Sequence, residues 1–550
     1  MKVLIVVPRE KNSENINYSY LFPLGLAYIS SALKSAGHNV HCFNLNHYSG
    51  AADLLINNHL AANKYDFICT GGLSTSYNQI KSIVDSVHSI KDSPKLILGG
   101  GIISSEPELM FNAFNPDYVV IGEGEETIVE LLSYLQNDRN IESVAGIGYR
   151  DDNGKIVFNK SRKNIVDLDS IPYPDFEGFE FNKYLDHMKP SDQSFYDLFD
   201  NPRVYPLICS RSCPFLCTFC FHPLGNKYRQ RSVDSVMREL KMMVEKYKIN
   251  VIAIYDELFS NDRKWLYDFC GEIKKFIKEL SWECKWSCQM RIDVVDDDML
   301  KTMKNSGCYM LSYGFESYSS KVIKSMKKHI TPEQIDCAIK LTLKNNLSLQ
   351  ANFIFGDILE TSSTAEETLN YWRKNSDAGI MLAFINPYPG THIYQYCVEK
   401  GLIKDKLDFI QNHIFDILNL TDNMTDNQFF KLWFDLHKAR LKYRTYGVIK
   451  SLKKEKEKTF IISVVCPHCK MVVEYKNYHI SSDMFFDLTV HCRNCRRRFF
   501  IVSHLYRIVL AFMVICYEII PNGMKIWTYN LFQKKLKSFV KQYVFKSIDK

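Results

Sequence analysis

Short apolar runs alternate with amphipathic stretches over the first 130 residues. The runs are rich in β-branched residues and the stretches have helical periodicity, which predicts strands spaced by helices. This alternation is typical of a parallel, doubly wound α/β sheet, which we expect over residues 1–145. The strands are expected at KVLIVV, NVHCFNL, FICTGG, KLILGGG and DYVVIG.

The pattern changes after residue 145. An Asp152-Asn153-Gly154 turn between extended runs, followed by two prolines, predicts a hairpin and linker over residues 146–195. Strand and helix then alternate in six repeats from about residue 204 to 386, which predicts a partial (βα)6 barrel of the TIM type over residues 196–400. A helical extension and a basic linker are expected over residues 401–455.

Small residues gather in three loops that follow strands of the first sheet. Sheets of this kind bind ligands beyond the carboxyl ends of their strands, and the loops are residues 71–76, 99–105 and 122–127. Glycines there let the backbone approach a ligand closely. Tight turns alone would also explain them, so both interpretations stay open.

The composition is that of an ordinary globular protein. A length of 550 residues predicts about three to five domains. Apolar residues make up 46% and charged residues 24%, which excludes a disordered, collagen-like or polytopic membrane chain. Lysine and arginine (69) exceed aspartate and glutamate (62) by 7, and a nucleic-acid partner does not follow from so mild an excess.

The seventeen cysteines are clustered rather than scattered. The apolar run from Val3 to Val7 is too short for a signal peptide, so we expect a cytoplasmic, reducing location instead of disulfides. Four cysteines lie from Cys209 to Cys220, and two CxxC pairs lie from Cys466 to Cys495. This clustering favours metal or cluster ligation.

Three of these cysteines follow the first strand of the predicted barrel: Cys213, Cys217 and Cys220. Three thiolates can hold three irons of a 4Fe-4S cluster and leave the fourth iron open to a small molecule. The alternatives are three buried cysteines without a metal, or a zinc site that borrows Cys209 or His222.

This motif, C-x3-C-x-aromatic-C with Phe219 in the aromatic position, resembles that of the radical S-adenosylmethionine (SAM) superfamily. The resemblance implies that SAM chelates the open iron and is cleaved to methionine and a 5′-deoxyadenosyl radical. It also implies SAM contacts at the ends of the later strands, where the matching residues are Asp256, Glu257, Arg291, Gly314, Glu316, Gly356 and Glu360. Ile358-Leu359 stand where members of the superfamily often have Pro-Gly, which puts the shape of that loop in doubt.

The N-terminal sheet resembles the cobalamin-binding domain of cobalamin-dependent radical SAM enzymes. The resemblance rests on residues 23–28, Gly99-Gly100, residues 122–125 and the linker 168–172. It implies cobalamin contacts at Ser74, Gly99, Gly100, Gly122 and Glu123.

A cobalt-ligating histidine is missing from the loop after the first strand. His47 follows the second strand instead, and Leu45 replaces the aspartate of the usual motif. We therefore interpret His47 as an ordinary surface or loop histidine and expect cobalt without a protein histidine, which the resemblance suggests is usual for this class.

The C-terminal pairs Cys466/Cys469 and Cys492/Cys495 have the spacing of a zinc ribbon, expected over residues 456–502. A rubredoxin-like iron site is the alternative. The basic run from Arg493 to Arg498 is expected to be a solvated face, although it could contact phosphate.

C-terminal helices are expected over residues 503–550. The apolar stretch 499–520 is interrupted by charges, so a buried helix is expected instead of a membrane span. Apolar residues between Phe532 and Tyr543 share one helical face flanked by lysines, which predicts either an interfacial helix in peripheral contact with a membrane or a helix docked on the protein.

Together these features predict an enzyme that uses a 4Fe-4S cluster, SAM and cobalamin to methylate an unactivated carbon. Cyclisation, oxidation or ring rearrangement on the same cofactors is the alternative. A methylthiotransferase is disfavoured because only Cys42 and Cys69 precede Cys209, and a cobalamin-sensing regulator would not need the three-cysteine motif. The expected partners are a small-molecule or lipid-like substrate and an electron donor such as flavodoxin or ferredoxin; nucleic acid is not expected.

Overall fold

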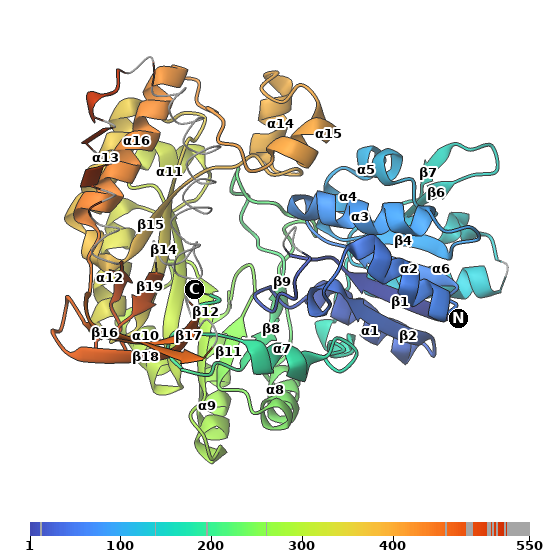
Figure 1. Cartoon of the computed structure of the whole chain (residues 1–550), viewed down its shortest axis with the longest axis horizontal. Helices are drawn as coiled ribbons and strands as arrows, with labels where there is room; N and C mark the ends of the chain where they lie inside the picture. Colours follow the sequence, from blue (N-terminus) through green and yellow to red (C-terminus); the bar gives the residue numbers. More distant parts are fainter. Residues whose placement is uncertain are drawn as a thin grey trace.

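Two parallel sheets, each covered by helices, form the two sides of the molecule (Figure 1). This computed structural model describes residues 1–550 except 11–13, 138, 194–195, 260, 457–458, 480–487, 503–507, 509–510, 513–514, 517, 522–523 and 525–550.

The first sheet has the strand order β2-β1-β3-β4-β5-β6-β7. Strands β1 to β5 are parallel, and the predicted hairpin, β6 and β7, extends the sheet in antiparallel fashion. The doubly wound sheet is thereby confirmed. Its strands are β1 (Lys2–Val7), β2 (Asn39–Asn44), β3 (Phe67–Gly71), β4 (Lys95–Gly99), β5 (Tyr118–Val120), β6 (Ile147–Arg150) and β7 (Ile156–Phe158).

Helices pack on both faces of this sheet. Because successive side chains of a strand point to opposite faces, Val3, Ile5 and Val7 of β1 join one core and Leu4 and Val6 join another. The helices of the first core are α1 (Leu24–Ser35) and α6 (Glu125–Gln136). Those of the second are α2 (Ala52–Ala62), α3 (Tyr77–His88), α4 (Gly101–Ser105) and α5 (Pro107–Phe114).

The second sheet confirms the partial (βα)6 barrel. Six parallel strands have the order β8-β11-β12-β13-β14-β15, and in the described part of the chain β8 and β15 do not pair, so the barrel stays open between them. The strands are β8 (Val204–Leu207), β11 (Val251–Ile254), β12 (Lys285–Met290), β13 (Cys308–Glu316), β14 (Ser348–Phe355) and β15 (Ile380–Phe384). The helices between them are α8 (Val233–Tyr247), α9 (Arg263–Glu279), α10 (Asp297–Asn305), α11 (Ser320–Ser325), α12 (Pro332–Lys344) and α13 (Ser362–Lys374).

The chain then returns to the first lobe before it forms the C-terminal ribbon. The returning segment contains α14 (His392–Glu399) and α15 (Lys406–Asp408), and Lys406 pairs with Glu106 at the start of α5. After α16 (Asp426–Tyr443) come the strands that we call the ribbon: β16 (Val448–Lys456), β17 (Thr459–Val465), β18 (Val472–His479), β19 (Leu488–His491) and β20 (Arg498–Ile501).

The basic segment 451–460 is largely a strand and not the expected linker. Its first six residues belong to β16, which pairs with β17 at the edge of a three-stranded antiparallel sheet. Backbone pairing leaves the lysine side chains exposed to solvent, and lysine is a common residue on edge strands because it opposes further pairing. A run of charges therefore did not mark a break in structure.

The expectation of a buried helix over residues 499–520 is wrong for the part that the structure describes. Ile508, Phe512 and Ile519 lie in helical segments and are 67%, 66% and 75% exposed. The amphipathic pattern from Phe532 to Tyr543 lies outside the described residues. Among the helices that are described, none has the length and apolar character needed to span a bilayer.

Candidate functional site

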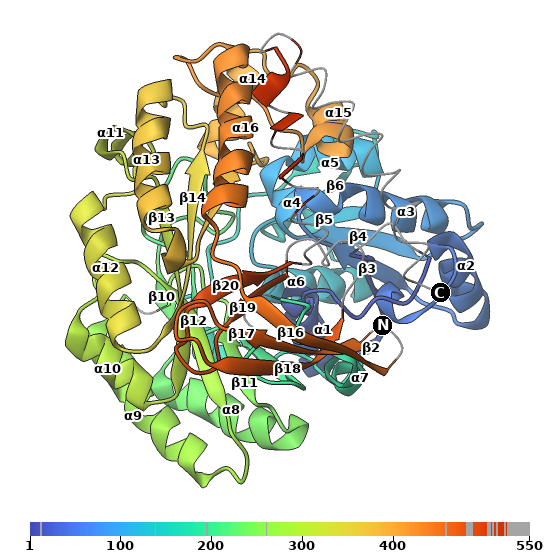
Figure 2. The same cartoon turned by 60° about the vertical axis from the view of Figure 1, so that its left-hand side comes forward.

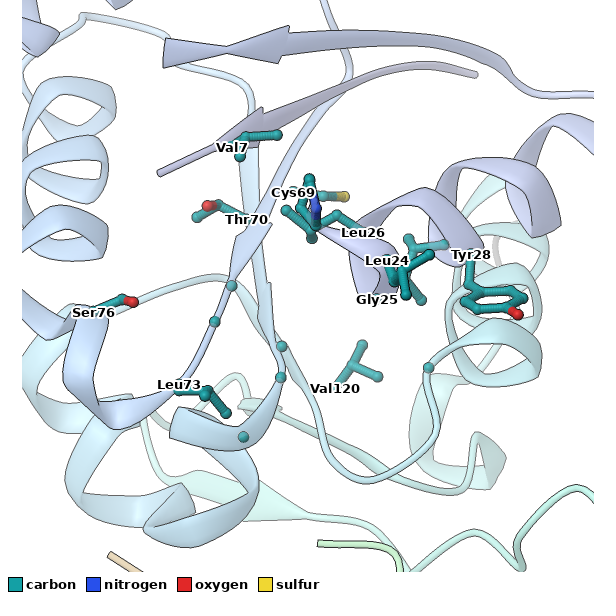
Figure 3. Close-up of a pocket in the computed structure, with 18 of the residues that line it drawn as sticks. Val7, Leu24, Gly25, Leu26, Tyr28, Cys69, Thr70, Leu73, Ser76 and Val120 are labelled. Carbon is teal, nitrogen blue, oxygen red and sulfur yellow. The ribbon is translucent and has the colours of Figure 1, made fainter. Parts of the chain in front are cut away.

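A cavity of about 530 Å³ opens at the carboxyl ends of β1, β3, β4 and β5 (Figure 3). Val7, Cys69, Thr70 and Val120 from these strand ends line it, together with residues at the start of α1. The position follows from the topology, because the strand order reverses between β1 and β3 and the crevice at such a switch point is where doubly wound sheets bind ligands.

The second lobe supplies the opposite wall of this cavity. Ile208, Arg211 and Ser212 come from the segment after β8, and Tyr255 and Glu257 follow β11. Ser212 directly precedes Cys213, so the cavity reaches the base of the cysteine loop. One space thus borders both sites that the sequence predicted.

The glycines around the cavity have different structural reasons. A Cβ on Gly71 would lie 2.3 Å from the carbonyl oxygen of Gly99, and Gly100 has φ +86° with the Gly72 oxygen 2.8 Å from a would-be Cβ. These positions need glycine for close backbone packing. Gly122 has φ +81° and open space beside it, and it lines the cavity. Tight turns and access to a ligand therefore both apply.

Ser74 and Glu123 stand apart from the other residues predicted to contact cobalamin. Ser74 is buried, with its hydroxyl 3.3 Å from that of Ser105, whereas Gly99, Gly100 and Ser76 line the cavity. Glu123 also lines the cavity, but its carboxylate is engaged within the protein.

Glu123 is the centre of a buried ion-pair network between the lobes. Its carboxylate accepts hydrogen bonds from Arg211 at 2.9 Å, from Arg229 at 2.8 Å and from the Ile165 backbone nitrogen at 2.7 Å. Glu125 pairs with Arg211 at 2.5 Å. The side chains of Glu123 and Arg229 are 3% and 4% exposed, so neither charge is compensated by water. Despite its burial, hydrogen bonds from Arg229 and Arg211 keep the pKa of Glu123 below its ordinary value.

The cysteine loop, residues 212–228, is closed at its base by a short hairpin. β9 (Ser210–Arg211) pairs with β10 (Arg229–Gln230) in antiparallel fashion. Inside the loop, Cys213 and Cys217 are partly buried and Cys220 is exposed. The Thr218 nitrogen bonds to the Met326 oxygen at 3.1 Å, which anchors the loop to the crossover between β13 and β14.

Lys328, after α11, and Arg291, after β12, place positive charge near the thiols. Burial raises the pKa of the Cys213 and Cys217 thiols, and the charges of Lys328 and Arg291 oppose this rise. Partly exposed cysteines beside cations are suited to thiolate ligation. The donor set therefore fits a 4Fe-4S cluster with one iron open.

Two of the predicted SAM contacts lie beside this loop. Arg291 stacks over the ring of Phe215 at 3.6 Å and pairs with Asp293 at 2.9 Å. Glu316 pairs with Lys328 at 2.8 Å and has φ +62°, an uncommon conformation for a non-glycine residue. Phe219, in the aromatic position of the motif, has the Lys328 ammonium 6.0 Å from its ring centroid.

Asp256 and Glu257 are adjacent in sequence but differ in environment. Asp256 is buried and accepts hydrogen bonds from the Cys209 nitrogen and the Ser210 hydroxyl, both at 2.7 Å, so it fixes the strand end that leads into the cysteine loop. Burial raises the pKa of Asp256 to about 7. Glu257 lines the cavity, and burial raises its pKa as well.

The loop after β14 is built around a buried carboxyl group. Glu360 accepts a hydrogen bond from the Gly356 nitrogen at 2.5 Å, and Gly356 has φ +97°, which favours glycine. Burial raises the pKa of Glu360 to about 8. Asp357 sits in the same turn and accepts from the Leu359 nitrogen, so Ile358-Leu359 form a tight turn without the usual Pro-Gly.

The interpretation of His47 as a surface or loop histidine is wrong. Its side chain is fully buried and hydrogen-bonded to Tyr20 at 2.8 Å and to Glu180 at 2.8 Å. The Tyr20 ring lines the cavity, while the imidazole points to the hydroxyl and the carboxylate behind it. Both imidazole nitrogens have protein partners, so the geometry leaves His47 no free ligand atom.

The four C-terminal cysteines meet as the spacing predicts. The sulfur atoms of Cys466, Cys469, Cys492 and Cys495 lie within 4.8 Å of one another. The two knuckles are alike: the Lys470 nitrogen bonds to the Cys466 oxygen at 3.0 Å, and the Arg496 nitrogen bonds to the Cys492 oxygen at 2.9 Å. Four convergent thiols on paired knuckles could hold one zinc ion in tetrahedral coordination.

The residues that join the two lobes were not predicted from the sequence. Arg211 and Arg229 flank the cysteine loop, and Lys328 reaches it from the crossover after α11, but none belongs to a motif. Arg229 lies 106 residues from Glu123, so no local pattern connects them. The signal in the sequence was Arg211, which lies two residues before Cys213. A cation so close to the motif would need an acidic partner if it were buried.

Comparison with known proteins agrees with this arrangement. The B12 binding domain family matches residues 18–132, and the radical SAM superfamily matches residues 207–371. The chain is 28% identical to an uncharacterized methyltransferase of Pyrococcus horikoshii over 73% of this chain and 84% of the relative. It is 26% identical to an anaerobic magnesium-protoporphyrin IX monomethyl ester cyclase of Rubrivivax gelatinosus over 76% and 75%.

A solved structure has the same fold. It is the radical S-adenosylmethionine methyltransferase TsrM from Kitasatospora setae with cobalamin and a [4Fe-4S] cluster bound, with a TM-score of 0.58 at 16% identity over 72% of this chain and 75% of that one.

Proposed function

Because the chain belongs to the cobalamin-dependent radical SAM enzymes, we propose that it transfers a methyl group to an unactivated carbon of a small molecule. When bound, SAM on the cluster supplies a carbon-centred radical and cobalamin carries the methyl group. The observation that carries the proposal is the shared cavity, lined from one side by the strand ends of the first sheet and from the other by Ser212 and Glu257 next to the cysteine loop.

The residues that would bind the cofactors lie in both lobes. Cys213, Cys217 and Cys220 would hold the cluster, with Lys328 and Arg291 as neighbouring positive charges. Glu316, Gly356 and the buried Glu360 shape the ends of β13 and β14, where the SAM superfamily positions fall. The backbone of Gly99, Gly100 and Gly122 leaves room for cobalamin at the first sheet.

The curated relatives favour methyl transfer over the alternative. Of the two relatives described above, the one with the higher identity is named as a methyltransferase and the other as a cyclase. A cyclase or oxidoreductase would use the same cavity but would have no methyl group to deliver, so the products derived from SAM distinguish the two chemistries.

The test is anaerobic reconstitution of the full chain with iron, sulfide, hydroxocobalamin and SAM labelled in its methyl group, followed by reduction. In a methyltransferase, one SAM would give its labelled methyl group to reduced cobalamin and leave unlabelled S-adenosylhomocysteine. A second SAM would accept one electron from the cluster and be cleaved to methionine and 5′-deoxyadenosine. Deoxyadenosine without any transfer of label to cobalamin would favour the cyclase or oxidoreductase alternative. If a protein that holds both cofactors forms neither product, the proposal is refuted.

Two finer points extend the proposal. The cluster needs a one-electron reductant, for which flavodoxin or ferredoxin is suitable. A lipid-like substrate rests only on the amphipathic sequence from Phe532 to Tyr543. Flotation with anionic liposomes, comparing the full chain with one that ends at Asn522, tests this idea; equal flotation of the two proteins would remove it.

A further inference from the structure

The ribbon lies against the two open edges of the partial barrel, next to α7 (Phe181–His187) (Figure 2). β8 and β15 are the edge strands of the second sheet, and the described residues supply no seventh or eighth strand to join them. Contacts from the ribbon reach the segment before β8 and the segment before β15. The proposed reaction assigns no role to either set of contacts.

On the β8 side, the ribbon binds Ser191 and the segment 197–201. The His491 backbone nitrogen donates to the Asp197 carboxylate at 2.5 Å, and its imidazole lies 3.2 Å from the same oxygen. Arg493 donates to the Asp197 backbone oxygen at 3.2 Å and pairs with Asp200 at 2.8 Å. Asp197 and His491 are only 3% and 5% exposed, so these contacts are shielded from water.

On the β15 side, the ribbon binds the turn that precedes the strand. Arg497 forms an ion pair with Asp377. Arg498 is buried and packs on Gly379, where a Cβ would lie 2.7 Å from the Arg498 Cβ. The basic run 493–498, expected to be a solvated face, therefore holds the ribbon to the barrel.

Both sets of contacts come from one metal knuckle. His491 and Arg493 flank Cys492, and Arg497 and Arg498 follow Cys495. In each knuckle the residue after the second cysteine has a positive φ, 62° at Lys470 and 60° at Arg496, so the backbone turns in the same way in both. Four thiolates on a single ion would hold this turn in place. The ion would therefore also fix the distance between the contacts before Cys495 and the contacts after it.

We propose that a zinc ion held by Cys466, Cys469, Cys492 and Cys495 makes the ribbon a clasp that ties the β8 edge of the open barrel to its β15 edge. A chain of contacts connects the clasp to the cofactor cavity. Asp197, which binds His491, is adjacent to Tyr196, whose hydroxyl lies 3.2 Å from that of Tyr255 in the cavity wall. This inference is independent of which reaction the cavity supports.

The experiment is hydrogen–deuterium exchange on the full chain with and without the metal. Metal analysis of the unmodified protein should find one zinc per chain besides the cluster iron. In the Cys492→Ser/Cys495→Ser variant, backbone amides of residues 197–207 and 377–384 should exchange at least about tenfold faster, whereas those of β12 and β13 should not change. Unchanged exchange at both edges in a zinc-free chain would overturn the clasp, as would a folded chain whose ribbon binds no metal.

A second variant keeps the experiment decisive if loss of the cysteines prevents folding. Arg497→Gln removes the ion pair with Asp377 and leaves all four ligands in place, so it should retain zinc and speed exchange at residues 377–384 alone. Lys476→Gln is the matched control, because the Lys476 side chain pairs with Glu474 on the same ribbon strand and the bond from Lys476 to Asp200 comes from the backbone nitrogen, which the substitution keeps. Equal exchange in these two variants would contradict the proposal.

Discussion

The two cysteine sites of this protein are built from the same side chain and have opposite designs. The loop of Cys213, Cys217 and Cys220 offers three thiols, one of them exposed, at the edge of a cavity that both lobes share. The ribbon offers four convergent thiols, two of them fully buried, on a pair of matching knuckles. A cluster with three protein ligands keeps a position for substrate, whereas a tetrahedral site with four does not.

Their surroundings differ in the same sense. The cysteine loop is bordered by cations, by the buried carboxyl group of Asp256, whose pKa is raised to about 7, and by Glu316 in a left-handed conformation. Local strain and perturbed acids are typical of functional sites. The ribbon's charged groups are instead paired with the barrel, through Arg493 and Arg497. We therefore assign the reaction to the cysteine loop and a structural role to the metal site of the ribbon.

The largest expected effect separates the two sites directly. Replacing Cys213, Cys217 and Cys220 by Ala should remove about four irons and abolish SAM cleavage, since no ligand to the cluster remains. The ribbon metal should stay, which metal analysis can check. Cys209→Ser serves as the control, because Cys209 is buried and adjoins the loop without belonging to the motif. Deoxyadenosine production by the triple variant would sink the assignment.

The next largest effect concerns the buried ion pairs that join the two lobes beside the cavity. Glu123→Ala leaves Arg229 buried without a carboxylate, while Arg211 keeps Glu125, and should cost about 3 kcal/mol of unfolding free energy. We also expect weaker retention of cobalamin, because the loop from Gly122 to Glu125 lines the cavity. Glu126→Ala removes a distant, exposed partner of Arg162 and should change the unfolding free energy by less than about 1 kcal/mol. Similar losses in both variants would show that the network adds little.

A smaller effect depends on pH. The pKa of Glu360 is raised to about 8 in the folded chain, so the folded state holds this proton more tightly than the unfolded state does. Its stabilising contribution is complete below the ordinary pKa and is lost as the pH rises towards 8. Glu360→Gln cannot ionise and keeps an oxygen for the Gly356 nitrogen, so it should become progressively more stable than the unmodified protein over this range. The gain should reach a few kcal/mol, since one pKa unit corresponds to about 1.4 kcal/mol.

Thermal unfolding of both proteins at several pH values from 5 to 9 measures this gain. A stability difference that stays constant across the range would mean that Glu360 is ionised in the folded protein and that its burial has little electrostatic cost.

The smallest expected effect is no spectral change at all. His47 is buried between Tyr20 and Glu180, so His47→Ala should lower stability while leaving the spectrum of bound cobalamin unchanged. Electron paramagnetic resonance of the Co(II) form provides the measurement. Nitrogen hyperfine splitting that disappears with the histidine would place the imidazole on cobalt and contradict the hydrogen-bond geometry.

Elements that are buried on both faces could be predicted from the sequence. Strands such as β1, β3, β4 and β11 are nearly continuous apolar runs, because both of their faces are buried, and the strand order made the cavity's location predictable from topology. The cysteine motifs were predictable because metal ligation requires fixed spacing. Both kinds of signal are local.

Features that depend on distant partners could not be predicted. The lysine-rich β16 pairs through its backbone, which its side chains do not reveal. His47 pairs with Glu180, 133 residues away, and Arg497 pairs with Asp377, 120 residues away. In each case a polar residue of a type that is usually exposed pairs with a residue on a distant element. The spacing of residues along the sequence does not indicate such a partner.

The central claim is that the loop of three cysteines, and not the ribbon, performs the chemistry. The most direct measurement is deoxyadenosine formation by the anaerobically reconstituted full chain with SAM and a reductant, compared between the Cys213→Ala/Cys217→Ala/Cys220→Ala and Cys492→Ser/Cys495→Ser variants. The account predicts none from the first variant and measurable formation from the second whenever it retains four cluster irons. Formation by the first variant, or none by an unmodified protein that holds its cluster and SAM, would contradict it.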